Sequence, residues 1–320
     1  MSVRTLALVA IAVVAAIGGA LGYYYYQQRA NVVRIGYQPS DHHTALFVAM
    51  EKKMLEKEGL KVEVYEFKAG PPETQALAAG KIDVAYIGCV PAITAYCKGV
   101  PIKIVAGVNQ EGSAIVVRKD EAGKVHSLKD LKGKRVAELM KGSIQDCMLR
   151  TALQREGLNP DKDVDIVEMK TADAVNALGA KRIDAFIEPE PGPTLAEKKG
   201  FGVRLMDTGQ IWPGHQCCVL VMRKDFIERH PDLAKKVLRA HVMATRYVIE
   251  HPDEAARIAA KWLKTSPDVE KEAMRHIKFT VDVNVDSVKM FARFLKRLGY
   301  IKREPDWSDF IDLKLLRQLA

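Results

Sequence analysis

A unit of helix, strand, helix and strand occurs twice in this chain, roughly 100 residues apart. In each copy an amphipathic helix ends at Glu-Gly-Leu, at residues 58–60 and again at 156–158, where the glycine suits a left-handed C-cap. An alternating strand and a short helix then lead to an Ile-Asp pair, at 82–83 and at 183–184, before an apolar strand. Alternation of strands with helices predicts a parallel sheet with right-handed crossovers. Two copies predict two similar α/β lobes.

Apolar segments outside the repeat supply further strands. We expect these strands at residues 32–36, 102–108, 114–118, 135–138, 203–206 and 217–222. The run at 102–108 is almost continuously apolar, which is typical of a strand covered on both faces. After residue 222 the pattern predicts helices to the end of the chain, because three Pro-Asp pairs place a proline and an acid in first helical turns.

The order of these elements places the second lobe inside the first. We predict a first lobe from residues 31–112 together with 214–320, and a second lobe from residues 113–213. The chain then crosses between the lobes near 110–115 and near 208–216. The expected fold class is α/β, with two doubly wound sheets in a two-lobed arrangement joined by a two-strand hinge.

Residues 1–30 precede the lobes and form a separate segment. No charge occurs between Thr5 and Gln28, and Tyr23–Tyr26 suit an interfacial aromatic belt. A helix needs about 20 apolar residues to cross a bilayer, so residues 5–26 fit a transmembrane anchor. A cleaved signal peptide is the alternative, because small residues occur within the apolar stretch. Both interpretations place the rest of the chain outside the cytoplasmic membrane.

Composition argues against several classes of protein. The formal net charge is +9, but the excess is spread along the chain, which favours an anionic ligand or lipid surface over a nucleic-acid partner. Five cysteines without a Cys-x-x-Cys pair do not make a disulfide scaffold or a zinc knuckle. The sequence has no Gly-x-Ser-x-Gly, Gly-Lys-Ser/Thr or Gly-x-Gly-x-x-Gly. We therefore expect no Ser-His-Asp catalysis, no P-loop and no dinucleotide site, and any ATP hydrolysis must belong to a partner.

Loops after the strands hold the candidate ligand-binding residues, because doubly wound sheets bind ligands at the carboxyl ends of their strands. Gly142 and Ser143 open a helix, where N–H groups and a hydroxyl suit an anion, although Ser143 also fits an ordinary N-cap. The predicted ligand-binding residues are Gln38, Ser40, Asp41, His42, His43, Gly88, Cys89, Asn109, Ser113, Gly142, Ser143, Gln145, Glu188, Glu190, Trp212 and His215.

Some of these residues have two interpretations. His42 and His43 either contact the ligand or are exposed at the start of a helix. Trp212 and His215 either close over a flat ligand or pack in the hinge. The sequence leaves these alternatives open.

Acidic and cysteine side chains raise further alternatives. Glu188 and Glu190 flank a proline at a strand end, where they either meet a donor or cation or lie on the surface. Cys217 and Cys218 are expected to alternate in a strand with one of them buried, and a redox or metal role is the alternative. A separate hypothesis is a transition-metal site with nitrogen and oxygen ligands from Asp41, His42, His43, Glu188, Glu190 and His215.

Several segments together resemble the nitrate, sulfonate and taurine substrate-binding proteins of ABC importers. The first holds Ala-Leu-Ala-Ala-Gly-Lys-Ile-Asp-Val-Ala-Tyr-Ile-Gly at 76–88 and Gly-Val-Pro-Ile-Lys-Ile-Val-Ala-Gly at 99–107. Later landmarks lie at 141–146, 182–189 and 218–226. The similarity extends over roughly residues 31–300. It implies a two-lobed periplasmic-binding-protein fold that captures a solute in the cleft between its lobes and delivers it to a permease.

We therefore expect an extracytoplasmic monomer, not an enzyme, that binds a small polar or anionic solute and works with an ABC permease and its ATPase subunit. No resident metal or other cofactor is expected. The alternatives are an enzyme related to those that build the thiamine pyrimidine, a binder of heteroaromatic vitamin precursors, and a binder of a transition metal or metal chelate. Cys217-Cys218 beside His215 is the part of this chain that is similar to the cysteine-rich motif of the thiamine-related enzymes.

Overall fold

The computed structural model describes residues 32–319. The predicted anchor or signal segment at residues 1–30, with its span at 5–26, lies outside the described residues and stays a prediction. Within the described part of the chain, no helix is both long enough and apolar enough to cross a membrane.

The first of two sheets in residues 32–319 has six strands. They are β1 (Val32–Tyr37), β2 (Lys61–Glu66), β3 (Val84–Gly88), β4 (Ile102–Glu111), β10 (Gln216–Arg223) and β11 (Ile277–Phe279). Their order across the sheet is β11-β4-β10-β3-β1-β2. β1 runs parallel to β2 and β3, whereas β10 runs antiparallel to both β3 and β4, and β11 runs antiparallel to β4.

The second sheet has five strands among the described residues. They are β5 (Ser113–Arg118), β6 (Arg135–Glu138), β7 (Asp165–Glu168), β8 (Ala185–Pro189) and β9 (Gly202–Asp207). Their order is β7-β6-β8-β5-β9. β6 runs parallel to β7 and β8, and β5 runs antiparallel to β8 and β9.

The two sheets share one arrangement, which confirms the predicted pair of α/β lobes. β1 lies between its parallel neighbours β2 and β3 as β6 lies between β7 and β8. Next to this unit each sheet takes an antiparallel strand, β10 beside β3 and β5 beside β8. Both sheets are therefore mixed and not wholly parallel, because β5 and β10 are the strands that arrive from the other sheet.

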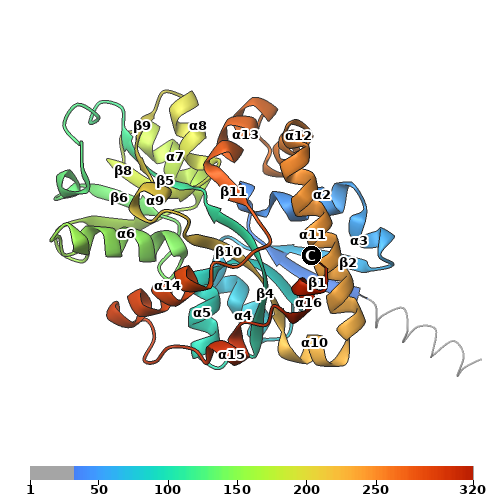
Figure 1. Cartoon of the computed structure of the whole chain (residues 1–320). Coiled ribbons are helices and arrows are strands. Elements are labelled where there is room, and N and C mark those ends of the chain that lie inside the picture. The colour runs from blue at the N-terminus through green and yellow to red at the C-terminus, as the bar shows by residue number, and fades with distance from the viewer. Residues whose placement is uncertain (1–31, 320) are drawn as a thin grey trace, which may run out of the picture.

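Helices pack around both sheets (Figure 1). Up to residue 155 they are η1 (Asp41–His43), α2 (Thr44–Glu51), α3 (Met54–Lys57), α4 (Gly70–Ala78), α5 (Cys89–Cys97), η2 (Leu128–Leu131) and α6 (Ile144–Arg155). Next come α7 (Thr171–Gly179), α8 (Gly192–Lys198), α9 (Thr208–Ile211), α10 (Lys224–Arg229) and α11 (Pro231–Glu250). The last are α12 (Pro252–Leu263), α13 (Pro267–Ala273), η3 (Met274–His276), α14 (Val285–Arg297), α15 (Trp307–Phe310) and α16 (Lys314–Arg317).

The glycine signals of the repeat act as predicted. Gly59 follows α3 with a φ of +77°, and Gly157 follows α6 with a φ of +81°. Both values lie in the left-handed region that favours glycine at a helix C-terminus. The repeat therefore ends its first helix by the same backbone turn in both lobes.

One expectation about the C-terminal part was wrong. Residues 277–279 form β11, which pairs with the end of β4, although the sequence predicted only helices after residue 222. A strand of three residues is too short to show a period-two pattern, so tertiary pairing determines it.

Two connections join the sheets. Gly112 leads from β4 directly into β5 with a φ of +93°, and a Cβ at this position would lie 2.5 Å from Nε2 of His42. The return connection runs from β9 through α9 to β10. The predicted lobe boundaries, 31–112 with 214–320 and 113–213, stay a prediction.

Candidate functional site

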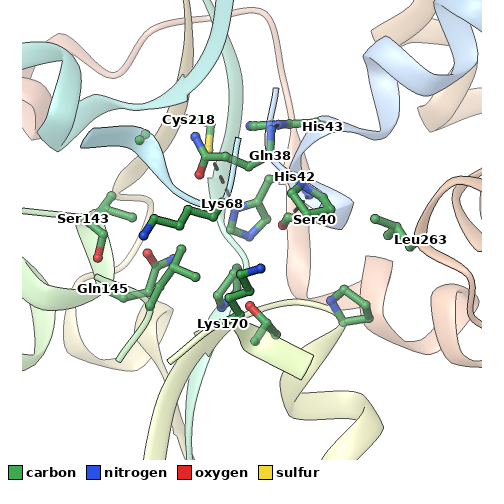
Figure 2. A pocket seen from close by; sticks show the side chains of 18 of the residues that line it. Gln38, Ser40, His42, His43, Lys68, Ser143, Gln145, Lys170, Cys218 and Leu263 are labelled. Carbon is green, nitrogen blue, oxygen red and sulfur yellow. Dashed lines mark hydrogen bonds between the residues drawn. The ribbon is translucent and has the colours of Figure 1, made fainter. Parts of the chain in front are cut away.

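A cavity of about 440 Å³ lies between the two sheets (Figure 2). From the first half of the repeat and the segments that pack on it, the lining residues are Gln38, Pro39, Ser40, His42, His43, Glu66, Lys68, Gly70, Gly88, Pro91, Cys218, Leu263 and Thr265. From the second, they are Leu139, Ser143, Ile144, Gln145, Lys170, Thr171, Ala172, Pro189, Pro191 and Leu195. Most of these residues follow the carboxyl ends of parallel strands, where doubly wound sheets bind ligands.

Two lysines extend into the cavity from opposite sheets (Figure 2). Lys68 follows β2 of the first sheet, and Lys170 follows β7 of the second. Neither ammonium group has an ion-pair or hydrogen-bond partner among residues 32–319. Two unpaired cations that face one space from both sides favour an anion between them.

The start of α6 supplies a hydroxyl to the same cavity. Ser143 is the N-cap of α6, and its Oγ accepts a 3.1 Å hydrogen bond from the Asp146 N–H. Because the oxygen accepts this bond, the hydroxyl proton of Ser143 stays available to a ligand in the cavity. The neighbouring Gly142 N–H instead donates to Asp146 Oδ2 at 2.8 Å, and Gly142 does not line the cavity.

Two glutamines in the wall are held by residues behind them. Gln145 donates from Nε2 to Ser113 Oγ at 3.0 Å, and Gln38 donates from Nε2 to Glu73 Oε2 at 2.7 Å. Each bond fixes the plane of the amide, and each amide retains further donor and acceptor capacity toward the cavity. The wall is therefore polar and oriented on both sides.

Two buried carboxyl groups lie behind the wall. Burial raises the pKa of Glu73 well above its ordinary value, and the hydrogen bond from Gln38 only partly offsets this effect. Burial also raises the pKa of Glu188, while the Thr171 hydroxyl donates to Glu188 Oε2 at 2.8 Å and lowers the pKa in part. In both groups burial therefore favours the neutral acid over the carboxylate.

The imidazole of His42 lies close to the thiols of Cys217 and Cys218 at the wall of the cavity. Its Nδ1 lies 3.5 Å from Cys217 Sγ and 3.7 Å from Cys218 Sγ, and the two sulfur atoms are 3.9 Å apart. The expectation that one of Cys217 and Cys218 is buried was wrong, because both are buried. The reason is that β10 lies between β3 and β4 and is buried from Gln216 to Met222, so side chains on both of its faces are covered. A register shift between Gln216 and Cys218 interrupts the alternation of side chains and turns both thiols toward His42.

The cavity brings together part of the predicted site. The predicted residues that line it are Gln38, Ser40, His42, His43, Gly88, Ser143 and Gln145. The predicted residues outside the lining are Asp41, Cys89, Asn109, Ser113, Gly142, Glu188, Glu190, Trp212 and His215. Neither histidine at the first helix start is exposed, since His42 and His43 are both buried.

The acidic residues outside the lining meet protein groups instead of solvent. Glu190 is fully buried, accepts a hydrogen bond from Arg204 at 2.8 Å and accepts another from the Thr194 N–H at 3.1 Å. Asp41 is fully buried beside Glu270. Burial is the main cause that raises the pKa of Asp41, and the carboxyl groups of Glu270 and Glu190 raise it further. Surface exposure of Glu188 and Glu190 is therefore excluded.

Trp212 and His215 pack near the second connection between the sheets. The ring of Trp212 lies 4.3 Å from that of Phe294 and 3.8 Å from the guanidinium carbon of Arg155. His215 is bonded through Nδ1 to the Trp212 carbonyl at 2.7 Å and packs edge-on against Phe291. Of the two interpretations left open by the sequence, these contacts agree with packing.

The proposed six-residue metal site is not assembled. Among residues 32–319, the cluster of His, Cys, Asp or Glu side chains close enough to hold one metal ion consists of His42, Cys217 and Cys218. Asp41, His43, Glu188, Glu190 and His215 do not belong to it.

The sequence contains a signal for the two cavity lysines, which are not among the predicted site residues. Glu66-Phe67-Lys68 begins at the last residue of β2 in the first copy, and Glu168-Met169-Lys170 begins at the last residue of β7 in the second. The same Glu-x-Lys pattern occurs at the end of the equivalent strand in both copies of the repeat. It indicates that Lys68 and Lys170 occupy equivalent positions in the two copies. Thr171 was missed because a threonine at the start of a helix is also an ordinary feature.

Comparison with known proteins decides the family. The model of the NMT1-like family matches residues 27–264 of this chain. The chain belongs to the NMT1-like family. The predicted resemblance to sulfonate-, taurine- and nitrate-binding proteins of ABC importers is thereby confirmed.

Individual relatives are similar to this chain over much of its length. The putative aliphatic sulfonates-binding protein of Bacillus subtilis (strain 168) is 28% identical over 97% of this chain and 95% of its own length. The taurine-binding periplasmic protein of Escherichia coli (strain K12) is 28% identical over 79% of this chain and 76% of its own. The solved alkanesulfonate-binding protein of Xanthomonas axonopodis pv. citri, bound to MOPS, has 21% identity and a TM-score of 0.78, covering 88% of this chain and 98% of that one. The two-lobed periplasmic-binding-protein fold is confirmed.

Proposed function

We propose that this protein captures a small organic anion, an alkanesulfonate or a compound like taurine, between its two lobes and delivers it to an ABC permease. The observation that carries the proposal is the placement of Lys68 and Lys170 in one cavity without protein partners. An anion held between them links the two sheets, so its binding energy favours the closed arrangement over an open one.

The charge around the cavity supports an anionic solute. Asp41, Glu188 and Glu190 are the acidic residues among the predicted ligand-binding residues, and none of them lines the cavity. Glu66 does line it, and its carboxylate accepts a 3.3 Å hydrogen bond from the Tyr37 hydroxyl. One exposed carboxylate against two ammonium groups leaves the cavity with an excess of positive charge.

The shape and chemistry of the wall support a sulfonate over a flat ring compound. Aromatic stacking is the usual means of holding a heteroaromatic ring. Among the described residues, no Phe, Tyr or Trp lines the cavity. A volume of about 440 Å³ with hydroxyl and amide groups on both sides suits a small organic anion that needs several donors. The solute-binding role of the relatives also favours capture over catalysis.

The place of action follows from the family and from the first residues of the sequence. We infer that the lobes, residues 31–112 with 214–320 and residues 113–213, work as a monomer outside the cytoplasmic membrane. Residues 5–26 would then hold the chain to the membrane beside its permease and ATPase partners. The periplasmic taurine-binding relative supports the extracytoplasmic location.

Calorimetry on the purified full chain tests the proposal. The panel contains ethanesulfonate, taurine, nitrate, bicarbonate and a pyrimidine precursor of thiamine. We expect one of the sulfonates to bind with a dissociation constant of about 1–10 µM, corresponding to about −7 to −8 kcal/mol, and to raise the melting temperature. Binding of the pyrimidine with no response to any sulfonate would overturn it.

A further inference from the structure

We propose that His42, Cys217 and Cys218 form a binding site for Zn²⁺ at the inner wall of the cavity, with the fourth coordination position open toward the cavity. The three residues have no assigned role in capture of an organic anion. The site therefore goes beyond the proposed function and does not depend on which solute is bound.

The backbone of β10 is what brings the two thiols to one side. Gln216 pairs with Gln110 on β4, and Cys218 pairs with the next residue, Asn109, so Cys217 is an extra residue on β10. Successive side chains of a regular strand point to opposite faces, whereas a bulge re-aims one of them. Both sulfur atoms consequently lie within 3.7 Å of the same imidazole nitrogen.

The separations of the three ligand atoms match one face of a zinc tetrahedron. With Zn–S near 2.3 Å and Zn–N near 2.0–2.1 Å, tetrahedral angles require about 3.8 Å between sulfur atoms and about 3.6 Å between sulfur and nitrogen. The Cys217 and Cys218 sulfur atoms are 3.9 Å apart, and they lie 3.5 and 3.7 Å from Nδ1 of His42. The three ligand atoms are therefore spaced as in a tetrahedral zinc site.

The imidazole of His42 presents the correct nitrogen. Its Nε2 lies 2.6 Å from the carbonyl oxygen of Gly112, which can only accept, so Nε2 carries the proton. Nδ1 then offers its lone pair toward the two cysteines when the ring is neutral. A backbone carbonyl that fixes the other ring nitrogen is the usual support of a zinc-bound histidine. Gly112 permits this close approach because a Cβ there would meet the ring at 2.5 Å.

The two ligands from β10 are thiols. Cys218 donates a hydrogen bond to the sulfur of Cys217. Zn²⁺ binds cysteine as the thiolate, so the bound ion replaces this proton. Two thiolates balance the charge of Zn²⁺, and metal binding must release protons.

The arrangement leaves one position of the ion accessible. His42 and Cys218 line the cavity (Figure 2), whereas Cys217 does not. Cys89, the next thiol in this region, donates to the carbonyl of Gln216 at 3.2 Å and is not part of the cluster. Three protein ligands and an open fourth position are typical of zinc sites that coordinate water or a bound solute, in contrast to closed structural sites.

Metal binding by the purified full chain tests this proposal, with thiols kept reduced and metal first removed by a chelator. Zn²⁺ is titrated by calorimetry in two buffers of different ionisation enthalpy. We expect one ion per chain, bound at micromolar concentration or tighter, with net release of protons. Co²⁺ in place of Zn²⁺ should give a thiolate-to-cobalt charge-transfer band in the near ultraviolet and the visible bands of tetrahedral cobalt.

Variants assign the ligands. C217S, C218S and H42Q should each weaken Zn²⁺ binding about 10- to 100-fold and reduce the charge-transfer band. C147A removes another buried cysteine, on α6, and should leave both readouts unchanged. Absence of Zn²⁺ binding and of the cobalt band in the unmodified chain overturns the proposal whatever the variants do. So does a band that survives in the C217S/C218S double variant. Calorimetry with ethanesulfonate in the same samples reports separately on solute capture.

Discussion

Lys68 and Lys170 occupy equivalent positions in the two copies of the repeated unit, and both face the same cavity (Figure 2). Each lies two residues after an edge strand of its sheet, Lys68 after β2 and Lys170 after β7. Lys170 is the N-cap of α7, and Lys68 lies two residues before α4. The internal repeat therefore places one cation of each lobe across from the other. This symmetry is the basis of the proposed anion capture.

Removal of either lysine should weaken solute binding. We expect K68M and K170M each to lower the affinity for a sulfonate about 5-fold, or about 1 kcal/mol, because each removes one solvent-accessible charge from the anion. The double variant should lose about 25-fold, and the dependence of affinity on salt should decrease. Calorimetry at low and high salt measures both effects. Lys296 is an exposed lysine on α14, so the K296M variant is the control. An equal loss of sulfonate affinity in K296M would contradict a specific role of Lys68 and Lys170.

Ser40 should connect solute binding with contact between the lobes. Its hydroxyl donates a 2.9 Å hydrogen bond to the carbonyl of Glu190, which follows β8 of the other sheet. Loss of one such bond costs about 1 kcal/mol, so S40A should lower the free energy of unfolding by that amount and sulfonate affinity by about 2- to 5-fold. Urea denaturation and calorimetry measure the two quantities. S308A removes an exposed hydroxyl and should change neither the free energy of unfolding nor the sulfonate affinity. If both quantities are also unchanged in S40A, Ser40 does not connect solute binding with contact between the lobes.

Gly112 should tolerate no side chain. Its φ of +93° is unfavourable for other residues, and a Cβ would lie 2.5 Å from His42 Nε2 and 2.8 Å from Ile277 Cγ1. We expect G112A to lower the free energy of unfolding by about 2–4 kcal/mol. Gly123 has no atom within 4 Å of a built Cβ, so G123A should be almost neutral. Denaturant melts of both variants check the prediction, which fails if the two behave alike.

The buried carboxyl of Glu188 should make stability depend on pH. Burial raises its pKa in the folded chain above the ordinary 4.5, so above pH 4.5 the unfolded chain loses a proton that the folded chain keeps. Stability contributed by this group is therefore lost as pH rises. Gln cannot ionise and can still accept from Thr171. E188Q should gain in melting temperature relative to the natural chain from pH 5 to pH 8. Glu250 is exposed, so the control E250Q should have the same melting temperature as the unmodified chain at each pH. A difference in melting temperature between E188Q and the unmodified chain that becomes smaller as pH rises would contradict a raised pKa of Glu188.

Local signals in the sequence predicted the frame of the fold. The repeat gave two parallel units, and Gly59 and Gly157 end equivalent helices with left-handed backbone. Strand-end loops identified part of the cavity wall, including Gln38, Ser143 and Gln145. These features depend on residues close together in the chain, which is why a single sequence reveals them.

Features that depend on distant partners could not be predicted. The bulge that turns Cys217 and Cys218 to one side arises from the pairing of β10 with β4. The burial of Glu190 depends on Arg204, which lies on another strand, and the position of Trp212 depends on Phe294 of α14. In each case the sequence contains the residue but not the neighbour that determines its role.

The central claim, that both lobes hold one anion between them, is tested most directly by the structure of the full chain crystallised with ethanesulfonate. Our account predicts a sulfonate group in the cavity within hydrogen-bond or ion-pair distance of both Lys68 and Lys170, with the Ser143 hydroxyl among its donors. A sulfonate bound elsewhere on the chain, or held by residues of only one sheet, would contradict it.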